Sequence, residues 1–167
     1  MPGRIYTVSC NNATMITAVN VLVAIYPVAT PPAAGSVLGI RRVEITQNAN
    51  ATSVQVRPVL SARTGGNLTV ATYTPKSQKY GGAASAIVGI AGTLAAGKCG
   101  IIGSADATPT YDDIRPVAAN ALNGWLWIPV PEEVLYFTGA VAFVVRFLAD
   151  PATLLGWDCT VNYEELY

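Results

Sequence analysis

Short runs of β-branched and aromatic residues, separated by clusters of Gly, Pro and Asn, recur along this chain. In residues 53–60, for example, Val54 and Val56 alternate with polar neighbours, and this two-residue period predicts a β-strand with one buried face. Strands do not alternate with helical patterns, so a parallel α/β sheet is not expected. Eight or nine short strands separated by turns predict an all-β sandwich, and a jelly-roll is the arrangement we expect. The predicted strands cover residues 4–9, 15–26, 37–46, 53–60, 68–73, 125–130, 134–137, 141–148 and 157–164.

The middle of the chain, residues 74–123, has a different composition, rich in Gly, Ala, Ser and Thr. Connections within a compact domain usually run ~4–6 residues, so a stretch of this length is either functional or partly folded. We therefore expect one sandwich domain over residues 1–167, with 74–123 as an extended loop or arm, or as an inserted subdomain. Its apolar run at 86–97 is too short to span a membrane, which takes ~20 residues, and is expected to lie against protein. The residues predicted to make that contact are Ile87, Val88, Ile90, Leu94, Ile101 and Ile102.

Charged residues make up only 12% of the chain, which is about half the usual fraction of ~25%. A surface with so little charge is typical of a subunit that its neighbours cover. The formal net charge is zero and like charges form no block, so nucleic-acid binding is not expected. The first residues lack the charged and apolar regions of a secretory signal, and we expect a soluble protein.

The chain contains no histidine, which excludes most of the common catalytic and metal-binding sites. Ser-His-Asp and Cys-His catalysis need an imidazole, as do nearly all zinc sites and facial-triad iron sites. Cys10, Cys99 and Cys159 have neither metal-ligand spacing nor an even count, so we expect free thiols packed as small apolar residues. Oxygen ligands for calcium cluster at 106–113, but without the pattern of an EF-hand loop. We therefore expect no enzyme activity, no cofactor and no metal.

Acidic pairs and tryptophans leave two further functions open. Adjacent acids such as Asp112 and Asp113 point to opposite faces of a strand, whereas a glycosidase needs two carboxyl groups that face each other. Trp125 and Trp127 share one strand face, and Trp157 lies on another predicted strand. Exposed, these rings would offer a platform for a sugar or a partner. The alternative, a place in the sandwich core, is favoured because large aromatic side chains dominate small β-cores.

Several segments of the chain resemble a family of small virion proteins of tailed phages and prophages. The segments are NGWLWIPVPEE at 123–133, VVRFL at 144–148, DPA at 150–152, TVNYEEL at 160–166, RIYTV at 4–8 and GIRRVEITQ at 39–47. The resemblance covers roughly two thirds of the chain, whereas residues 80–103 depart from the family's pattern.

This resemblance implies a virion structural protein that decorates, or cements, the capsid exterior and is made in the host cytoplasm. It implies the major capsid protein as partner and a homotrimer as the assembly, with no direct contact to nucleic acid or membrane. No catalytic residues come with the family. Two alternatives remain open: a glycan-binding β-sandwich in the tail or a fibre head, and a carboxylate-based glycosidase.

Overall fold

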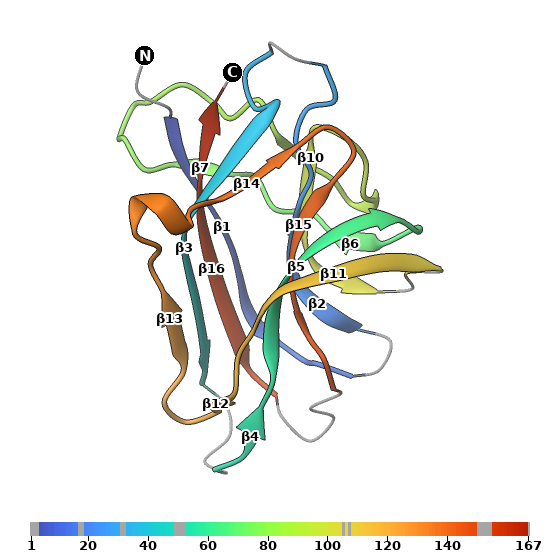
Figure 1. Cartoon of the computed structure of the whole chain (residues 1–167), viewed down its shortest axis with the longest axis vertical. Helices are drawn as coiled ribbons and strands as arrows, with labels where there is room; N and C mark the ends of the chain where they lie inside the picture. The colour runs from blue at the N-terminus through green and yellow to red at the C-terminus, as the bar shows by residue number, and fades with distance from the viewer. Residues whose placement is uncertain are drawn as a thin grey trace.

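The chain folds into two largely antiparallel β-sheets that face each other and are seen edge-on in Figure 1. The computed structural model describes residues 4–16, 19–30, 33–48, 53–104, 106, 108–149 and 155–166. Asp150, Pro151 and Ala152, which contribute to the family resemblance, lie outside the described residues. The predicted all-β sandwich is confirmed. Among the described residues the one helix is the short 3-10 helix η1 (Pro131–Glu133), and none is long and apolar enough to cross a membrane.

The two sheets differ in size, and a small separate pair joins β4 (Gln55–Val56) to β12 (Ala119–Asn120). The first sheet consists, in spatial order, of β13 (Trp125–Trp127), β3 (Val37–Gln47), β16 (Trp157–Leu166), β1 (Arg4–Ala13) and β7 (Lys76–Ser77), with β14 (Leu135–Thr138) also paired to β3. The second sheet consists of β11 (Pro109–Pro116), β5 (Pro58–Gly65), β15 (Ala142–Phe147), β2 (Val19–Ile25), β10 (Lys98–Ser104), β6 (Thr69–Ala71) and β9 (Gly92–Thr93), with β8 (Val88–Gly89) paired to β10.

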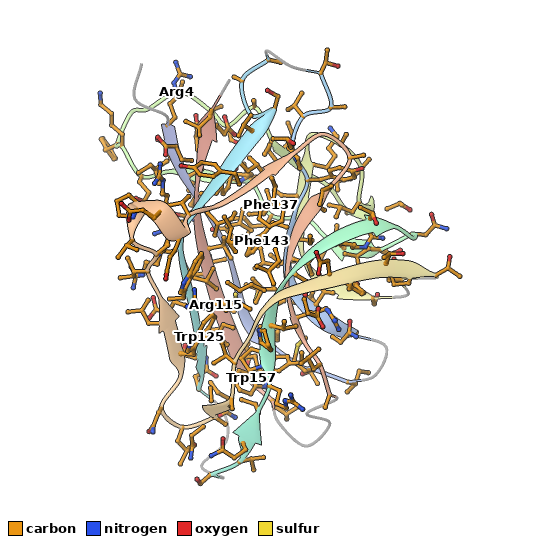
Figure 2. All side chains as sticks on the ribbon, viewed as in Figure 1. Arg4, Arg115, Trp125, Phe137, Phe143 and Trp157 are labelled. Atoms are coloured by element: carbon orange, nitrogen blue, oxygen red, sulfur yellow. The ribbon has the colours of Figure 1, made fainter. Side chains whose placement is uncertain are left out.

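The main core lies between the sheets, because one face of each long strand is apolar. In β16 every second residue belongs to this core: Trp157, Cys159, Val161 and Tyr163. Phe137 of β14 and Phe143 of β15 meet between the sheets, with ring centroids 5.3 Å apart (Figure 2). The alternation read from the sequence therefore corresponds to real inward and outward faces.

The tryptophans belong to the core. Trp127 and Trp157 are buried, and Trp125 is partly buried against the same cluster. The Trp157 ring packs on Phe147, with centroids 4.8 Å apart. The core interpretation of these residues is confirmed, and a flat platform of exposed indole rings is not present at these positions.

Residues 66–108 form an insertion at the tip of one hairpin. Strands β5 and β11 pair from Val59 to Gly65, and Gly65 is the partner of Pro109 across the pair. The chain therefore leaves the hairpin after Gly65 and returns to the same point. The expected loop at 74–123 has other boundaries in the structure, because 109–116 is a strand of the sandwich and 69–71 already lies within the insertion.

Much of the insertion is part of the second sheet and does not project as an arm. Strand β10 pairs with β2 on one side and with β6 on the other. Its glycines resemble loop residues in the sequence, yet close packing requires them. A Cβ on Gly100 would lie 2.3 Å from the Val70 side chain, and one on Gly103 would lie 2.8 Å from Leu68. Glycine here permits one strand to lie close against another.

The insertion also builds a second apolar cluster on the outer face of the second sheet. This cluster consists of Leu68, Val70 and Leu94 from the insertion with Val21, Ala24, Ala142 and Val144 from β2 and β15. The alternate residues of β15, Phe143 and Val145, face the main core. Burial on both faces explains why residues 141–148 are apolar almost throughout.

Candidate interaction surface

The three cysteines are free thiols buried inside the fold, as the sequence predicts. Burial raises the pKa of Cys10 and of Cys99 to about 12, and it raises the pKa of Cys159 well above its usual value. These thiols stay protonated at neutral pH, and only the thiolate is a strong nucleophile or metal ligand. In the part of the chain that the structure describes, no three cysteine or acidic side chains come together as a metal site.

Two of the acidic residues at 106–113, Asp106 and Asp113, are engaged by arginines. Both oxygens of Asp106 accept hydrogen bonds of 2.6 Å from the buried Arg63 guanidinium, and one also accepts a bond of 2.8 Å from the Tyr111 hydroxyl. The Arg146 guanidinium lies 4.2 Å from the Tyr111 ring centroid and donates to Asp113 at 2.7 Å. These bonds fasten the returning end of the insertion to the outer face of the second sheet.

The pKa values of Arg63 and Tyr111 are both shifted by burial and by the negative charge of Asp106. Burial lowers the pKa of Arg63, but the hydrogen bond and charge of Asp106 outweigh it, so that the pKa is raised overall. Burial and then the bond to Asp106 raise the pKa of Tyr111 to about 12. Calcium takes six to eight oxygen ligands. Because Arg63 and Tyr111 already occupy Asp106, the calcium site considered at 106–113 does not fit this arrangement.

A buried carboxylate holds the insertion against the first sheet. Glu165, near the end of β16, accepts hydrogen bonds from the Ser85 hydroxyl and from the backbone amides of Ala86 at 3.1 Å and Ile87 at 3.4 Å. A buried carboxylate is tolerated when donors satisfy its oxygens. These bonds position residues 85–87 over the end of the main core.

The six residues predicted to contact a partner do not gather into one exposed surface. Ile87 and Leu94 are buried inside the fold, in the main core and in the second cluster respectively. Three others are partly buried against the same clusters: Ile90, Ile101 and Ile102. Val88 on β8 is 50% exposed. That these residues touch a partner stays a prediction, and Val88 is the one whose side chain is accessible.

A row of exposed aliphatic side chains follows the edge of the first sheet instead. Leu126 lies between the core residues Trp125 and Trp127, and Ile128 and Val130 follow at two-residue spacing; the three side chains are 51%, 64% and 54% exposed. Tyr136 of β14 is 54% exposed on the same outer face, where its ring lies over Gly39 of β3. Leu126, Ile128, Val130 and Tyr136 are called the apolar strip below. The outward face of a solvated sheet is normally polar, but these residues make it apolar here.

Beside the strip a groove opens between the edges of the two sheets. It has a volume of about 220 Å³ and is lined by Ala62 of β5, Ile114 of β11, Val141 and the whole of β14. This edge groove and the strip are neighbours along β3, since β13 pairs with residues 43–45 and β14 with residues 37–40. Arg115, labelled in Figure 2 near Trp125, spans this edge with its guanidinium 5.6 Å from the Trp127 ring.

At the opposite edge, beside β1 and β7, lies a larger open pocket of about 750 Å³. Arg4 and Lys79 line it together with Gly81 and Gly82. The turn that forms its wall carries Tyr80 with a fully exposed side chain. Among the described residues that line it, two are basic and none is acidic, which gives this pocket a positive character.

Comparison with protein-family models, with curated proteins and with solved structures finds no match to this chain. The strip itself has a signal in the sequence. The six residues WLWIPV at 125–130 are apolar at every position, so that an extended segment there has no polar face. The strip residues Leu126, Ile128 and Val130 lie between and directly after the two tryptophans, which alone were considered as a platform.

Proposed function

We propose that this chain is a virion structural protein that decorates the exterior of a tailed-phage capsid. It would strengthen the shell through contacts with the major capsid protein and with copies of itself in a homotrimer. The phage setting rests on the sequence resemblance. The structural observation that carries the proposal is the apolar strip, because exposed apolar rows on a chain with few charges mark contact surfaces.

The proposed action is mechanical. Each subunit contributes modest contacts, and symmetry repeats them over the whole shell, so that their sum offsets the pressure of packaged DNA. This role requires no reacting group, and the described acids and thiols are consistent with it, since the thiols are buried and Asp106, Asp113 and Glu165 are held in internal bonds.

The strand order supports a jelly-roll as the architecture. Without the insertion, and with β13 and β14 counted as one edge because they pair with successive parts of β3, the first sheet runs β1-β16-β3-β14 and the second β2-β15-β5-β11. The first and last strands therefore adjoin in one sheet, and the second and second-to-last adjoin in the other. An eight-stranded jelly-roll has this arrangement, and viral capsid proteins and lectins use it.

Glycan binding in a tail or fibre head is the second candidate, and the basic pocket is the observation that favours it. Trp157 is buried and cannot serve as a sugar platform, whereas Tyr80, Arg4 and Lys79 are accessible beside a pocket of about 750 Å³. Ring stacking and paired cations would suit an acidic sugar. Binding to a glycan array that disappears in Tyr80→Ala and Lys79→Ala, with Trp125→Ala unchanged, would favour this candidate.

Imaging of intact particles tests the main proposal. Antibody or gold label against this chain, applied to particles of the phage or prophage that encodes it, should appear at regular positions over the head. Heads that lack the chain should release their DNA at a lower temperature than complete heads. Label confined to the tail would support glycan binding, and absence of the chain from the particle exterior would contradict decoration.

A further inference from the structure

The apolar strip and the edge groove lie side by side, and they are complementary because both are apolar and one projects while the other is recessed. The strip presents three aliphatic side chains that project outwards, and the groove is an apolar recess of about 220 Å³ between Ile114 and β14. We propose that Leu126, Ile128 and Val130 of one copy of this chain pack into the edge groove of a second copy. The inference rests on the assembly role proposed above and names its self-contact.

The size of the surface fits a contact between copies. The four strip residues, each about half exposed, present roughly 300 Å² of apolar surface, which is about a third of what one partner contributes to a standard interface. Tyr136 belongs to both surfaces, and the other residues that line the groove add to this area. An interface of this kind has an apolar centre and a polar rim.

The rim carries both signs of charge, which favours a second copy over a strongly charged partner. Arg42 and Glu44 of β3 lie beside Leu126, and they bind each other at 2.6 Å. Arg115 and Glu133 lie 3.6 Å apart at the same edge. Exposed Glu132 adds an acid near Val130, but most of the charges in this patch are paired, so that it can face a copy of itself with little net repulsion, as a homo-oligomer requires.

Side chains, and not backbone pairing, would make this contact. Strand β13 spans only Trp125–Trp127, and Pro129 and Pro131 follow it without amide hydrogens to donate. Short edge strands and prolines prevent sheets from joining edge to edge. The exposed apolar strip is therefore left to pack, and a recess on another copy is the matching surface that this chain itself offers.

The mass of the purified chain in solution tests the inference. Light scattering and sedimentation velocity should give two or three chains per particle for the natural sequence at about 100 µM. Ile128→Ser should raise the dissociation constant about tenfold, and Leu126→Ser with Ile128→Ser should leave monomers. Val88→Ser, an equally exposed apolar position away from this edge, is the matched control and should keep the natural mass.

A mixing experiment identifies the two halves of the contact. Ile114→Asp, which places a charge at the groove, should also give monomers. Mixed with the strip double variant, it should form pairs of one chain each, because one intact strip then meets one intact groove. Circular dichroism should be unchanged in all variants, and so should thermal unfolding at concentrations low enough for the natural chain to be monomeric, since the altered side chains are exposed in the single chain.

The outcomes separate this inference from the proposed function. A natural chain that stays monomeric at every concentration, or a strip double variant of unchanged mass, overturns the self-contact. Monomeric strip variants that still label the phage head leave decoration standing and support the self-contact. A chain that self-associates through the strip but is never found on particles supports the self-contact and contradicts decoration.

Discussion

The two edges of the sandwich differ in how far the chain itself covers their apolar side chains. At the edge formed by β1 and β2, the insertion adds β7 to the first sheet and β10 to the second (Figure 1). Tyr73 links the two sheets there. Its hydroxyl accepts a hydrogen bond of 2.9 Å from Ser9, and its carbonyl accepts one of 3.5 Å from the Cys99 thiol. At the edge formed by β11, β13 and β14, the described residues leave the apolar strip exposed.

This difference indicates where each kind of stabilisation comes from. Apolar side chains at the first edge are covered by the same chain, so their burial contributes to folding. Those at the second edge are exposed in the single chain, so under the self-contact proposed above they would gain burial, and contribute to stability, only on association. Substitutions at the first edge should therefore lower the free energy of unfolding, whereas substitutions at the second should weaken assembly and leave the fold intact.

The largest effect is expected where the insertion is fastened to the sheet by a buried ion pair. Arg63→Ala should lower the free energy of unfolding by about 3–5 kcal/mol, because the nearly buried Asp106 would lose its cation. Urea unfolding followed by tryptophan fluorescence measures this. Arg42→Ala removes an exposed ion pair at the open edge and should cost less than about 0.5 kcal/mol.

A double variant shows whether Arg63→Ala destabilises the protein because the ion pair is lost or because Asp106 is left buried without a cation. Arg63→Met combined with Asp106→Leu removes both charges and should recover most of the stability lost in Arg63→Ala, because well-packed apolar residues often replace a buried pair. If the double variant is as unstable as the single one, the pair itself, and not an unpaired buried acid, holds the insertion in place.

The second-largest loss of stability is expected when packing between the insertion and the second sheet is removed. Leu94→Ala removes buried methyl groups from the second apolar cluster and should cost about 2–4 kcal/mol. Hydrogen exchange should also speed up at the amides of β9 and β6, which lie beside Leu94 in the insertion. Unchanged unfolding would mean that the insertion does not cover this face in solution.

A smaller effect is expected at the buried carboxylate. Glu165→Gln places an amide group opposite the backbone donors of Ala86 and Ile87, and it should cost about 1–3 kcal/mol through bonds that are no longer satisfied. Faster hydrogen exchange at those two amides is the direct measurement. Glu133→Gln, at an exposed position beside the open edge, should leave the same amides unchanged.

Sequence reasoning finds the strands that alternate or are apolar throughout, and it misses a strand that is rich in glycine. Residues 53–60 and 157–164 alternate cleanly, and both regions contain strands in the structure. The strand at 98–104 was not predicted, because Gly100 and Gly103 resemble loop residues. Glycine is required at these two positions because β6 packs closely against β10. That contact joins residues distant in sequence, so it leaves no local pattern.

The candidate surface shows the same limit. Hydrophobic residues in the glycine-rich segment were predicted to face a partner, yet Ile87 and Leu94 are buried because the insertion folds back onto the sheets. The charge-poor composition predicts that neighbours cover part of the surface, and this stays a prediction; composition alone does not indicate which part. Exposure at residues 126–130 follows from the edge position of β13, and edge position is a property of topology that one sequence does not state.

The smallest expected effect on folding is also the sharpest test of the contrast between the edges. Leu126→Ala makes the same chemical change as Leu94→Ala, but at a side chain that is 51% exposed. Measured on monomers at low concentration, it should change the free energy of unfolding by less than about 0.5 kcal/mol. Self-association should nevertheless weaken about tenfold, because the lost methyl groups are buried only between copies. If Leu126→Ala instead destabilises the monomer as strongly as Leu94→Ala, the strip is covered by its own chain, and the distinction between the two edges fails.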